Sequence, residues 1–136
     1  MSDPQIENQR IVWFDMPVTD LDRAIAFYRE VLAIQIDKES FENFTFAVLE
    51  HGPGNGGCLI PDPEHKPTDS GPLMYFGVEG RLPDAVEKTR AHGGEVVQDT
   101  HPIGPHGFRA IVRDSEGNRI ALHSETNSGR VRGSGG

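Results

Sequence analysis

Apolar residues in this chain gather in short runs that polar and glycine-rich segments separate. Most runs are rich in branched and aromatic residues and end near glycine, proline or aspartate, a pattern typical of β-strands. The predicted strands are residues 10–18, 44–50, 57–61, 72–78, 95–100, 108–114 and 119–124. The segments HGPGNGG and DSEGN each lie between two of these strands, and both predict a hairpin connection.

Two other segments repeat their apolar residues every three or four positions, as the buried face of a helix does. In the first, residues 19–33, this face consists of Leu21, Ile25, Tyr28 and Leu32. Thr19 or Asp20 can cap its first turn, because a short oxygen-bearing side chain accepts a hydrogen bond from a free backbone N–H. The second, residues 82–94, has Pro83 near its start and two glycines at its end, as helices often do.

The predicted elements follow the same order twice: a strand, a helix and then further strands. The segment VTDLDRAIAFY begins 60 residues before VEGRLPDAVEKT, and both combine the end of an apolar strand with the start of a helix. Such internal similarity indicates a repeated structural unit. The sequence therefore predicts an α+β fold of two βαβββ modules. We expect their helices to cover one side of a curved mixed sheet, whose concave side forms a ligand groove.

The repeat also predicts the domain boundaries. We expect one folded domain, residues 10–125, between a flexible N-terminus and a glycine- and serine-rich disordered tail. The predicted segments are the N-terminus 1–9, module one 10–61, a proline-rich linker 62–71, module two 72–125 and the tail 126–136.

Composition narrows the class of partner. The chain has 136 residues and a formal charge of −8, and no basic stripe offsets that charge, which argues against nucleic acids and anionic membranes. Cys58 is its one cysteine, so an internal disulfide is excluded and we expect this residue to pack in the core. The N-terminus carries no apolar signal segment and no run is long enough to span a membrane, so a cytoplasmic protein is expected.

Four segments in this order resemble the glyoxalase / bleomycin-resistance / extradiol-dioxygenase superfamily, the vicinal oxygen chelate proteins. They are WFDMPVTDLDRAIAFYREVL, GPLMYFGVEG, AHGGEVV and DSEGNRIALHS. The likeness is greatest to the short bacterial glyoxalase-related proteins of unassigned reaction. It implies paired βαβββ modules, a homodimer and a small-molecule ligand on the concave sheet. In metal-dependent members, four strands each supply one His or Glu to a divalent cation.

The resemblance places these four metal positions at Trp13, Pro61, Leu73 and Ala121. None of these side chains offers an imidazole or a carboxylate, so no metal or other cofactor is expected here. The loop histidines form no HxH, HxxxH or HExxH pair. A displaced metal site that uses His101 or His106 remains an alternative.

Strand alternation then predicts which residues line the groove, because side chains two positions apart share a face. The predicted lining is Trp13, Asp15, Leu59, Tyr75, Arg119 and His123. Asp15 beside His123 would orient the imidazole for proton transfer. Alternatively, His123 only bonds a neighbour and Asp15 forms a salt bridge with Arg119. Trp13 and Tyr75 either contact a planar or cationic ligand or pack in the core.

We therefore expect a protein that binds a small organic molecule in an aromatic groove, without the family's usual divalent metal. Its reaction is unassigned; a lyase or an oxidoreductase is compatible with the family. One alternative is a resistance protein that sequesters an antibiotic without chemistry. Another is a metal-dependent lyase or dioxygenase with a displaced site.

Overall fold

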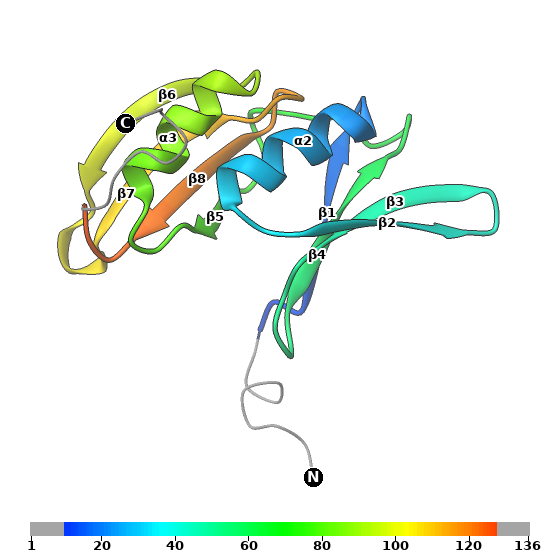
Figure 1. Cartoon of the computed structure of the whole chain (residues 1–136), viewed down its shortest axis with the longest axis horizontal. Helices are drawn as coiled ribbons and strands as arrows, with labels where there is room; N and C mark the ends of the chain where they lie inside the picture. The colour runs from blue at the N-terminus through cyan, green and yellow to red at the C-terminus, as the bar shows by residue number, and fades with distance from the viewer. Residues whose placement is uncertain (1–9, 128–136) are drawn as a thin grey trace, which may run out of the picture.

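The chain forms two modules of the same design (Figure 1). A computed structural model describes residues 10–127, so the predicted flexible N-terminus and most of the predicted tail lie outside the described residues. The first module contains β1 (Trp13–Val18), α2 (Leu21–Leu32), β2 (Ile36–Phe41), β3 (Phe44–Leu49) and β4 (Gly56–Pro61). The second contains β5 (Met74–Gly77), α3 (Leu82–Ala91), β6 (Glu95–Pro102), the short 3-10 helix η1 (Gly104–His106), β7 (Phe108–Arg113) and β8 (Arg119–Ser124).

Each module folds into one four-stranded mixed sheet. The strand orders are β1-β4-β3-β2 and β5-β8-β7-β6, and in both sheets the first strand runs parallel to the last. The predicted α+β fold of two βαβββ modules is therefore confirmed. The strands form two separate sheets, however, and not the one continuous sheet that the sequence led us to expect. The modules meet through side chains instead: the rings of Phe14 in β1 and Phe76 in β5 lie 5.6 Å apart.

A single hydrophobic core joins the two modules. Helices α2 and α3 contact each other, and Figure 1 shows them side by side. Tyr28 of α2 is fully buried, and its ring centroid lies 5.7 Å from that of Phe76 in the second module. Because the buried faces of both helices and both sheets converge, neither module has a core of its own.

The helix ends follow the sequence signals. Asp20 caps α2, and its carboxylate accepts a hydrogen bond of 3.0 Å from the backbone N–H of Arg23. Ala33 ends the same helix in the left-handed conformation, with φ 55°. Pro83 lies in the first turn of α3, and Gly93 follows that helix with φ 91°. These ends explain why the helix boundaries could be predicted to within a few residues.

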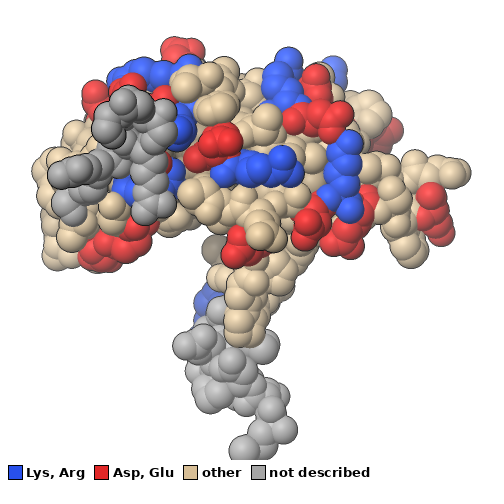
Figure 2. Space-filling model, viewed as in Figure 1, with Lys and Arg blue, Asp and Glu red and all other residues tan. Residues whose placement is uncertain are grey.

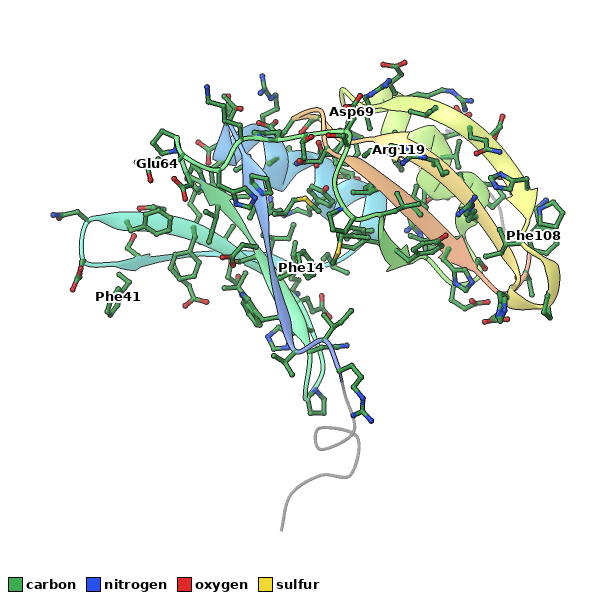
Figure 3. All side chains as sticks on the ribbon, turned by 180° about the vertical axis from the view of Figure 1, so that it is seen from behind. Phe14, Phe41, Glu64, Asp69, Phe108 and Arg119 are labelled. Atoms are coloured by element: carbon green, nitrogen blue, oxygen red, sulfur yellow. The ribbon has the colours of Figure 1, made fainter. Side chains whose placement is uncertain are left out.

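Strand β2 was not predicted. Its sequence, IDKESF, carries three charged residues, and every residue after Ile36 is exposed. The strand lies at the edge of its sheet, where charged side chains cost little and oppose unwanted pairing. The hairpin of β2 and β3 projects from the rest of the molecule, and Figure 3 shows Phe41 at its far end.

The predicted hairpin turn DSEGN, residues 114–118, also holds the modules together. Glu116 accepts hydrogen bonds from the backbone N–H groups of Thr19 and Asp20, at 2.8 and 2.7 Å. Asn118 donates to the carbonyl of Pro17 at 2.7 Å. The turn of the second module therefore binds the segment between β1 and α2 of the first. We call this set of contacts the 114–118 clamp.

Charges of both signs are interspersed on the face that carries the helices (Figure 2). This face shows no large basic area. Among residues 10–127, no helix is both long enough and apolar enough to cross a membrane.

Candidate functional site

One face of the second sheet is free of helices. Strand β8 alternates between Ile120 and Leu122, which are fully buried in the core, and Arg119, Ala121 and His123, which point to the opposite side. Cross-strand pairing extends this side over three strands, since Tyr75 pairs with Ala121 and Arg109 pairs with His123. We call this side the open face. Its residues include Tyr75, Gly77, Arg109, Ile111, Arg113, Arg119, Ala121 and His123.

A hydrogen-bonded cluster occupies one end of the open face. The guanidinium of Arg109 donates through Nε to Nε2 of His101 at 3.0 Å and through Nη1 to the hydroxyl of Tyr75. It also lies 5.9 Å from the centroid of the Tyr75 ring, a distance compatible with a cation–π contact. The rings of Tyr75 and His123 lie edge to face at 6.4 Å. The cluster therefore presents an arginine, a tyrosine and a histidine side by side.

Hydrogen bonds determine which nitrogen of each histidine carries the proton. Nε2 of His123 lies 2.6 Å from the carbonyl oxygen of His106, which can only accept, so this nitrogen is the donor. Nδ1 of His101 donates in the same way to the carbonyl of Asp99 at 2.8 Å, and its Nε2 accepts from Arg109. Nδ1 of neutral His123 is consequently a proton acceptor on the open face.

The loop between β6 and β7 places the His106 carbonyl. Gly104 and Gly107 adopt φ values of 65° and 92°, which side chains disfavour, and the backbone N–H of Ile103 closes the loop onto the carbonyl of Gly107 at 2.9 Å. The tight loop brings His106 back over the end of β8. His123 and His106 were not expected to interact, because the sequence gives no sign of how this loop folds.

Trp13 and Asp15 lie on the corresponding face of the first sheet. Asp15 pairs with Cys58, whose thiol donates to the carboxylate at 3.3 Å. Burial and the bond to Asp15 raise the pKa of the Cys58 thiol to about 11. Trp13 is 42% exposed, and its ring contacts His51 edge to face at 5.5 Å. The expectation that Cys58 faces the core is therefore wrong. The side chain is buried, but it points to the side of the sheet that carries Asp15.

Leu59 does not line a groove. It is fully buried in the hydrophobic core and pairs with Met16, so its predicted place on the ligand side is wrong. Pro61 pairs with Val18 and points to the same core side. Gly57 permits this orientation: it lies on the same side as Leu59, and a Cβ there would approach within 2.3 Å of the Phe14 ring, so only glycine fits at this position. Because GCLIP is apolar on both sides, its sequence does not reveal its orientation.

Asp15 and His123 are not brought together in one chain. Their hydrogen-bond partners are Cys58 and the His106 carbonyl, and no hydrogen bond or ion pair joins the two among the described residues. Asp15 and Arg119 do line one cavity of about 180 Å³ beside the linker, but they form no ion pair in this part of the chain. The interpretation that Asp15 orients His123 within one chain therefore has no support in its contacts.

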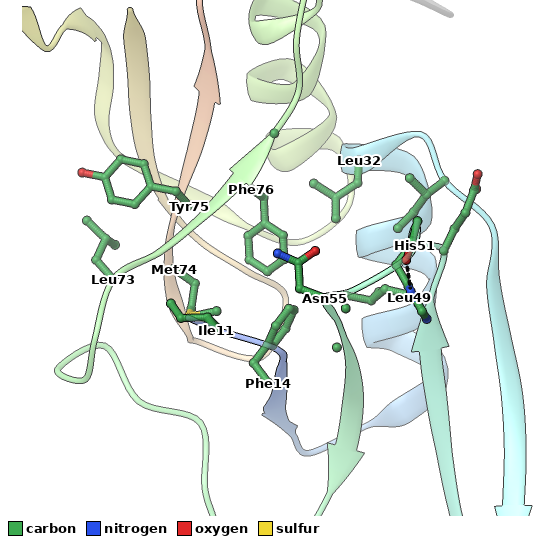
Figure 4. Close-up of a pocket in the computed structure, with 16 residues that line it drawn as sticks. Ile11, Phe14, Leu32, Leu49, His51, Asn55, Leu73, Met74, Tyr75 and Phe76 are labelled. Atoms are coloured by element: carbon green, nitrogen blue, oxygen red, sulfur yellow. Dashed lines mark hydrogen bonds between the residues drawn. The ribbon is translucent and has the colours of Figure 1, made fainter. Parts of the chain in front are cut away.

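A larger cavity, of about 580 Å³, lies between the modules next to the open face (Figure 4). Ile11, Phe14, Leu32 and Phe76 supply an apolar wall. His51, Asn55 and Glu50 supply polar groups, and the Glu50 carboxylate accepts a hydrogen bond of 2.8 Å from the backbone N–H of Gln35. Tyr75 and Gly77 belong to both the cavity wall and the open face. His51 and Asn55 could not be expected here from the sequence, because both lie in the glycine-rich connection that was interpreted only as a turn.

The described residues do not fit a metal at the family positions. Trp13, Leu73 and Ala121 offer no ligand atom, and the β4 residue that shares a side with Trp13 near that position is Ile60 rather than Pro61. Both ring nitrogens of His101 already have hydrogen-bond partners. Within residues 10–127, no three His, Cys, Asp or Glu side chains come close enough together to hold a metal ion.

Comparison with known proteins agrees with this architecture. The model of the Glyoxalase/Bleomycin resistance protein/Dioxygenase superfamily matches residues 10–122. The chain belongs to this superfamily. Its match spans both modules, so the superfamily's fold accounts for nearly all of the described structure.

Individual members of the superfamily are distant from this chain. A lactoylglutathione lyase of Escherichia coli O157:H7 is 29% identical over 135 residues, which cover 91% of this chain and 98% of the relative. Glyoxalase I of Leishmania major superimposes with a TM-score of 0.66 at 25% identity, over 87% of this chain and 88% of its own. A fosfomycin resistance protein of Listeria monocytogenes gives 0.64 at 16% identity, over 81% and 86%, and shows the fold alone.

Proposed function

We propose that this member of the superfamily binds a small organic molecule over the open face and the adjoining cavity, without a divalent cation at the family positions. One observation carries the proposal: a half-exposed tyrosine lines a cavity of about 580 Å³ and shares the open face with an oriented imidazole, while the family's metal positions hold no ligand atoms. Cavities of this size, apolar with a few polar groups, suit small organic ligands.

His123 is the residue we assign to proton transfer. Its Nε2–H is held by the His106 carbonyl, which leaves Nδ1 to take a proton from a ligand on the open face. Tyr75, 49% exposed, would contact the body of the ligand, and Arg119 would contact it from the other end of the open face. Trp13 and Asp15 are assigned to the ligand side of the first sheet.

A homodimer is part of the proposal, because the assigned residues lie on two sheets. In the described part of one chain, no hydrogen bond, ion pair or ring contact links Trp13 or Asp15 to Tyr75 or His123. Strands β1 and β5 are sheet edges, and Ile11 and Trp13 are exposed beside one of them. A second copy would cover such edges. Light scattering at micromolar concentration tests this, and a monomer mass would contradict it.

Metal analysis tests the central claim. The purified chain would be incubated with nickel, zinc, manganese and iron(II), desalted, and its metal content measured by elemental analysis. We expect far less than one metal ion per chain. A near-stoichiometric ion would contradict the proposal and favour lyase activity like that named for the Escherichia coli relative.

A ligand screen tests the location. Two-dimensional NMR with a library of small organic molecules should give chemical-shift changes centred on β5 and β8, and Tyr75→Ala should weaken these hits. Hits that map only to other elements would contradict the assignment. Turnover of a hit would identify an enzyme, whereas binding without turnover would favour sequestration.

The cytoplasmic location stays a prediction, which cell fractionation would check.

A further inference from the structure

The open face carries positive charge that the rest of this acidic chain does not neutralise. Among the described residues, Arg23, Arg81, Arg90 and Arg113 each form an ion pair with a carboxylate. In the same part of the chain, neither Arg109 nor Arg119 has an Asp or Glu oxygen within the 4.0 Å limit for an ion pair. Arginines on the open face therefore differ from one another, because Arg113 lies on the same face and forms ion pairs with both Asp69 and Glu95.

Arg109 is held in place by uncharged partners. His101 accepts from Nε at 3.0 Å, the hydroxyl of Tyr75 accepts from Nη1, and the hydrogen bond from His101 to the Asp99 carbonyl keeps His101 a neutral acceptor. A guanidinium has five N–H donors, and these two bonds use only part of them. The arginine is thus oriented while its charge and its remaining donors are available.

There is room for a ligand group beside this arginine. Gly77 is exposed on the same side as Tyr75 and pairs with His123, and a Cβ placed on it would meet no atom within 4 Å. The apolar cavity between the modules begins at the same two residues of β5, Tyr75 and Gly77. A ligand could therefore place a polar end over the open face and an apolar body in the cavity.

We infer that the ligand is an organic oxyanion, whose carboxylate or phosphonate group binds Arg109 over Gly77 while its apolar part enters the inter-module cavity. This inference rests on the proposed function, since it names the chemistry of the ligand for the same site. A planar guanidinium fork matches the oxygens of either group. Charge-assisted bonds of this kind favour an anion strongly over its neutral analogue.

Matched small aromatic compounds test the inference on the full-length protein. Benzoate, phenylphosphonate and the neutral benzamide would be titrated by NMR and calorimetry at fixed ionic strength. We expect at least one of the two anions to bind about tenfold or more tightly than benzamide, with shifts on β5 and β8. The better anion identifies the group that the site prefers.

Variants separate the site from the net charge of the protein. Arg109→Gln should remove the preference for the anion, whereas Lys88→Gln, which makes the same charge change on α3, should leave it unchanged. Gly77→Leu fills the open space without changing charge and should weaken anion binding about tenfold or more. This second variant keeps the test valid if Arg109→Gln does not fold.

The outcomes distinguish this inference from the proposed function. If benzamide binds at β5 and β8 as tightly as both anions, the inference is overturned while the proposed function stands. The inference is also overturned if neither anion binds, if folded Arg109→Gln keeps the preference for the anion, or if folded Gly77→Leu keeps the wild-type affinity for the anion. If all three compounds shift only other elements, both proposals fail.

Discussion

Histidine chemistry on the open face depends on which ring nitrogen carries the proton. His101 and His123 lie in the same region of the second sheet, yet their partners require opposite tautomers, Nδ1–H for His101 and Nε2–H for His123. The first serves to orient Arg109, and only the second leaves a nitrogen free to accept a proton on the open face.

These tautomers give the first prediction. At pH 8, where an ordinary histidine with a pKa of about 6.5 is neutral, long-range ¹⁵N NMR should show Nδ1–H for His101 and Nε2–H for His123. Arg109→Gln should leave the His123 tautomer unchanged and should remove the hydrogen bond that Nε2 of His101 accepts. The same tautomer at both residues would contradict the arrangement of the cluster.

Cys58 gives the second prediction at this scale. A pKa of about 11, against an ordinary value of 9.0, lowers the thiolate fraction about a hundredfold at pH 8. The folded protein should therefore react with an aromatic disulfide reagent at least about a hundredfold more slowly than the urea-unfolded chain. Asp15→Asn should speed the reaction, because it removes the carboxylate that raises the pKa of Cys58.

The control for this experiment is Asp37→Asn, at an exposed position of β2, which should leave the rate unchanged. Rapid labelling of the folded wild-type protein would show that Cys58 is neither as buried nor as weakly acidic as the structure indicates.

At the scale of elements, local signals determined most boundaries. The cap at Asp20 and the apolar face of α2 were both visible in the sequence. The charged strand β2 was not, because an exposed edge strand needs no apolar alternation. The end of α2 carries a mild local conflict, since Ala33 adopts a left-handed conformation that disfavours any residue with a Cβ.

Ala33→Gly should therefore stabilise the protein. Removing the Cβ relieves the left-handed strain, while the added freedom of the unfolded chain offsets part of the gain, so we expect about 0.5–1 kcal/mol. Ala26→Gly, on the exposed side of the same helix, should instead destabilise by about 1 kcal/mol. Urea unfolding followed by circular dichroism measures both, and a loss of stability in Ala33→Gly would contradict the prediction.

At the scale of the whole molecule, the 114–118 clamp joins the modules. Glu116 accepts bonds from Thr19 and Asp20 and forms an ion pair with Arg23 at 2.7 Å. Burial raises the pKa of Glu116, but the bonds from Arg23 and from the backbone N–H groups outweigh burial and hold the pKa below its ordinary value of 4.5. The carboxylate therefore stabilises the fold above that value, and its contribution is lost as the pH falls through the lowered pKa.

Glu116→Gln should lower the free energy of unfolding at pH 7 by about 1–3 kcal/mol, because it weakens several charge-assisted hydrogen bonds. The variant should also lose less stability than the wild type as the pH falls below 4.5. Denaturant unfolding across this pH range measures both effects. Glu64→Gln, an exposed carboxylate in the linker, is the matched control. Equal pH dependence of Glu116→Gln and wild type would contradict the role of the clamp.

Part of the candidate site could be predicted from the sequence alone. The alternation of RIALHS correctly placed Arg119 and His123 on the side opposite Ile120 and Leu122, because polar and apolar residues alternate there. The apolar segment GCLIP has no such contrast, so the orientation of Leu59 and Cys58 could not be inferred. Arg109 was missed as a member of the site, and His101 was considered only for a displaced metal site, because their contact depends on how β6 and β7 pair.

The sequence by itself determined the repeated modules, the two helices and the hairpin turns, because periodicity, caps and turn residues act over a few neighbouring positions. Only the tertiary structure decided that the strands form two sheets and that the 114–118 turn joins the modules across nearly a hundred residues. It also decided that His123 bonds the His106 carbonyl rather than Asp15. These features depend on the packing of distant segments around one shared core, for which no local pattern exists.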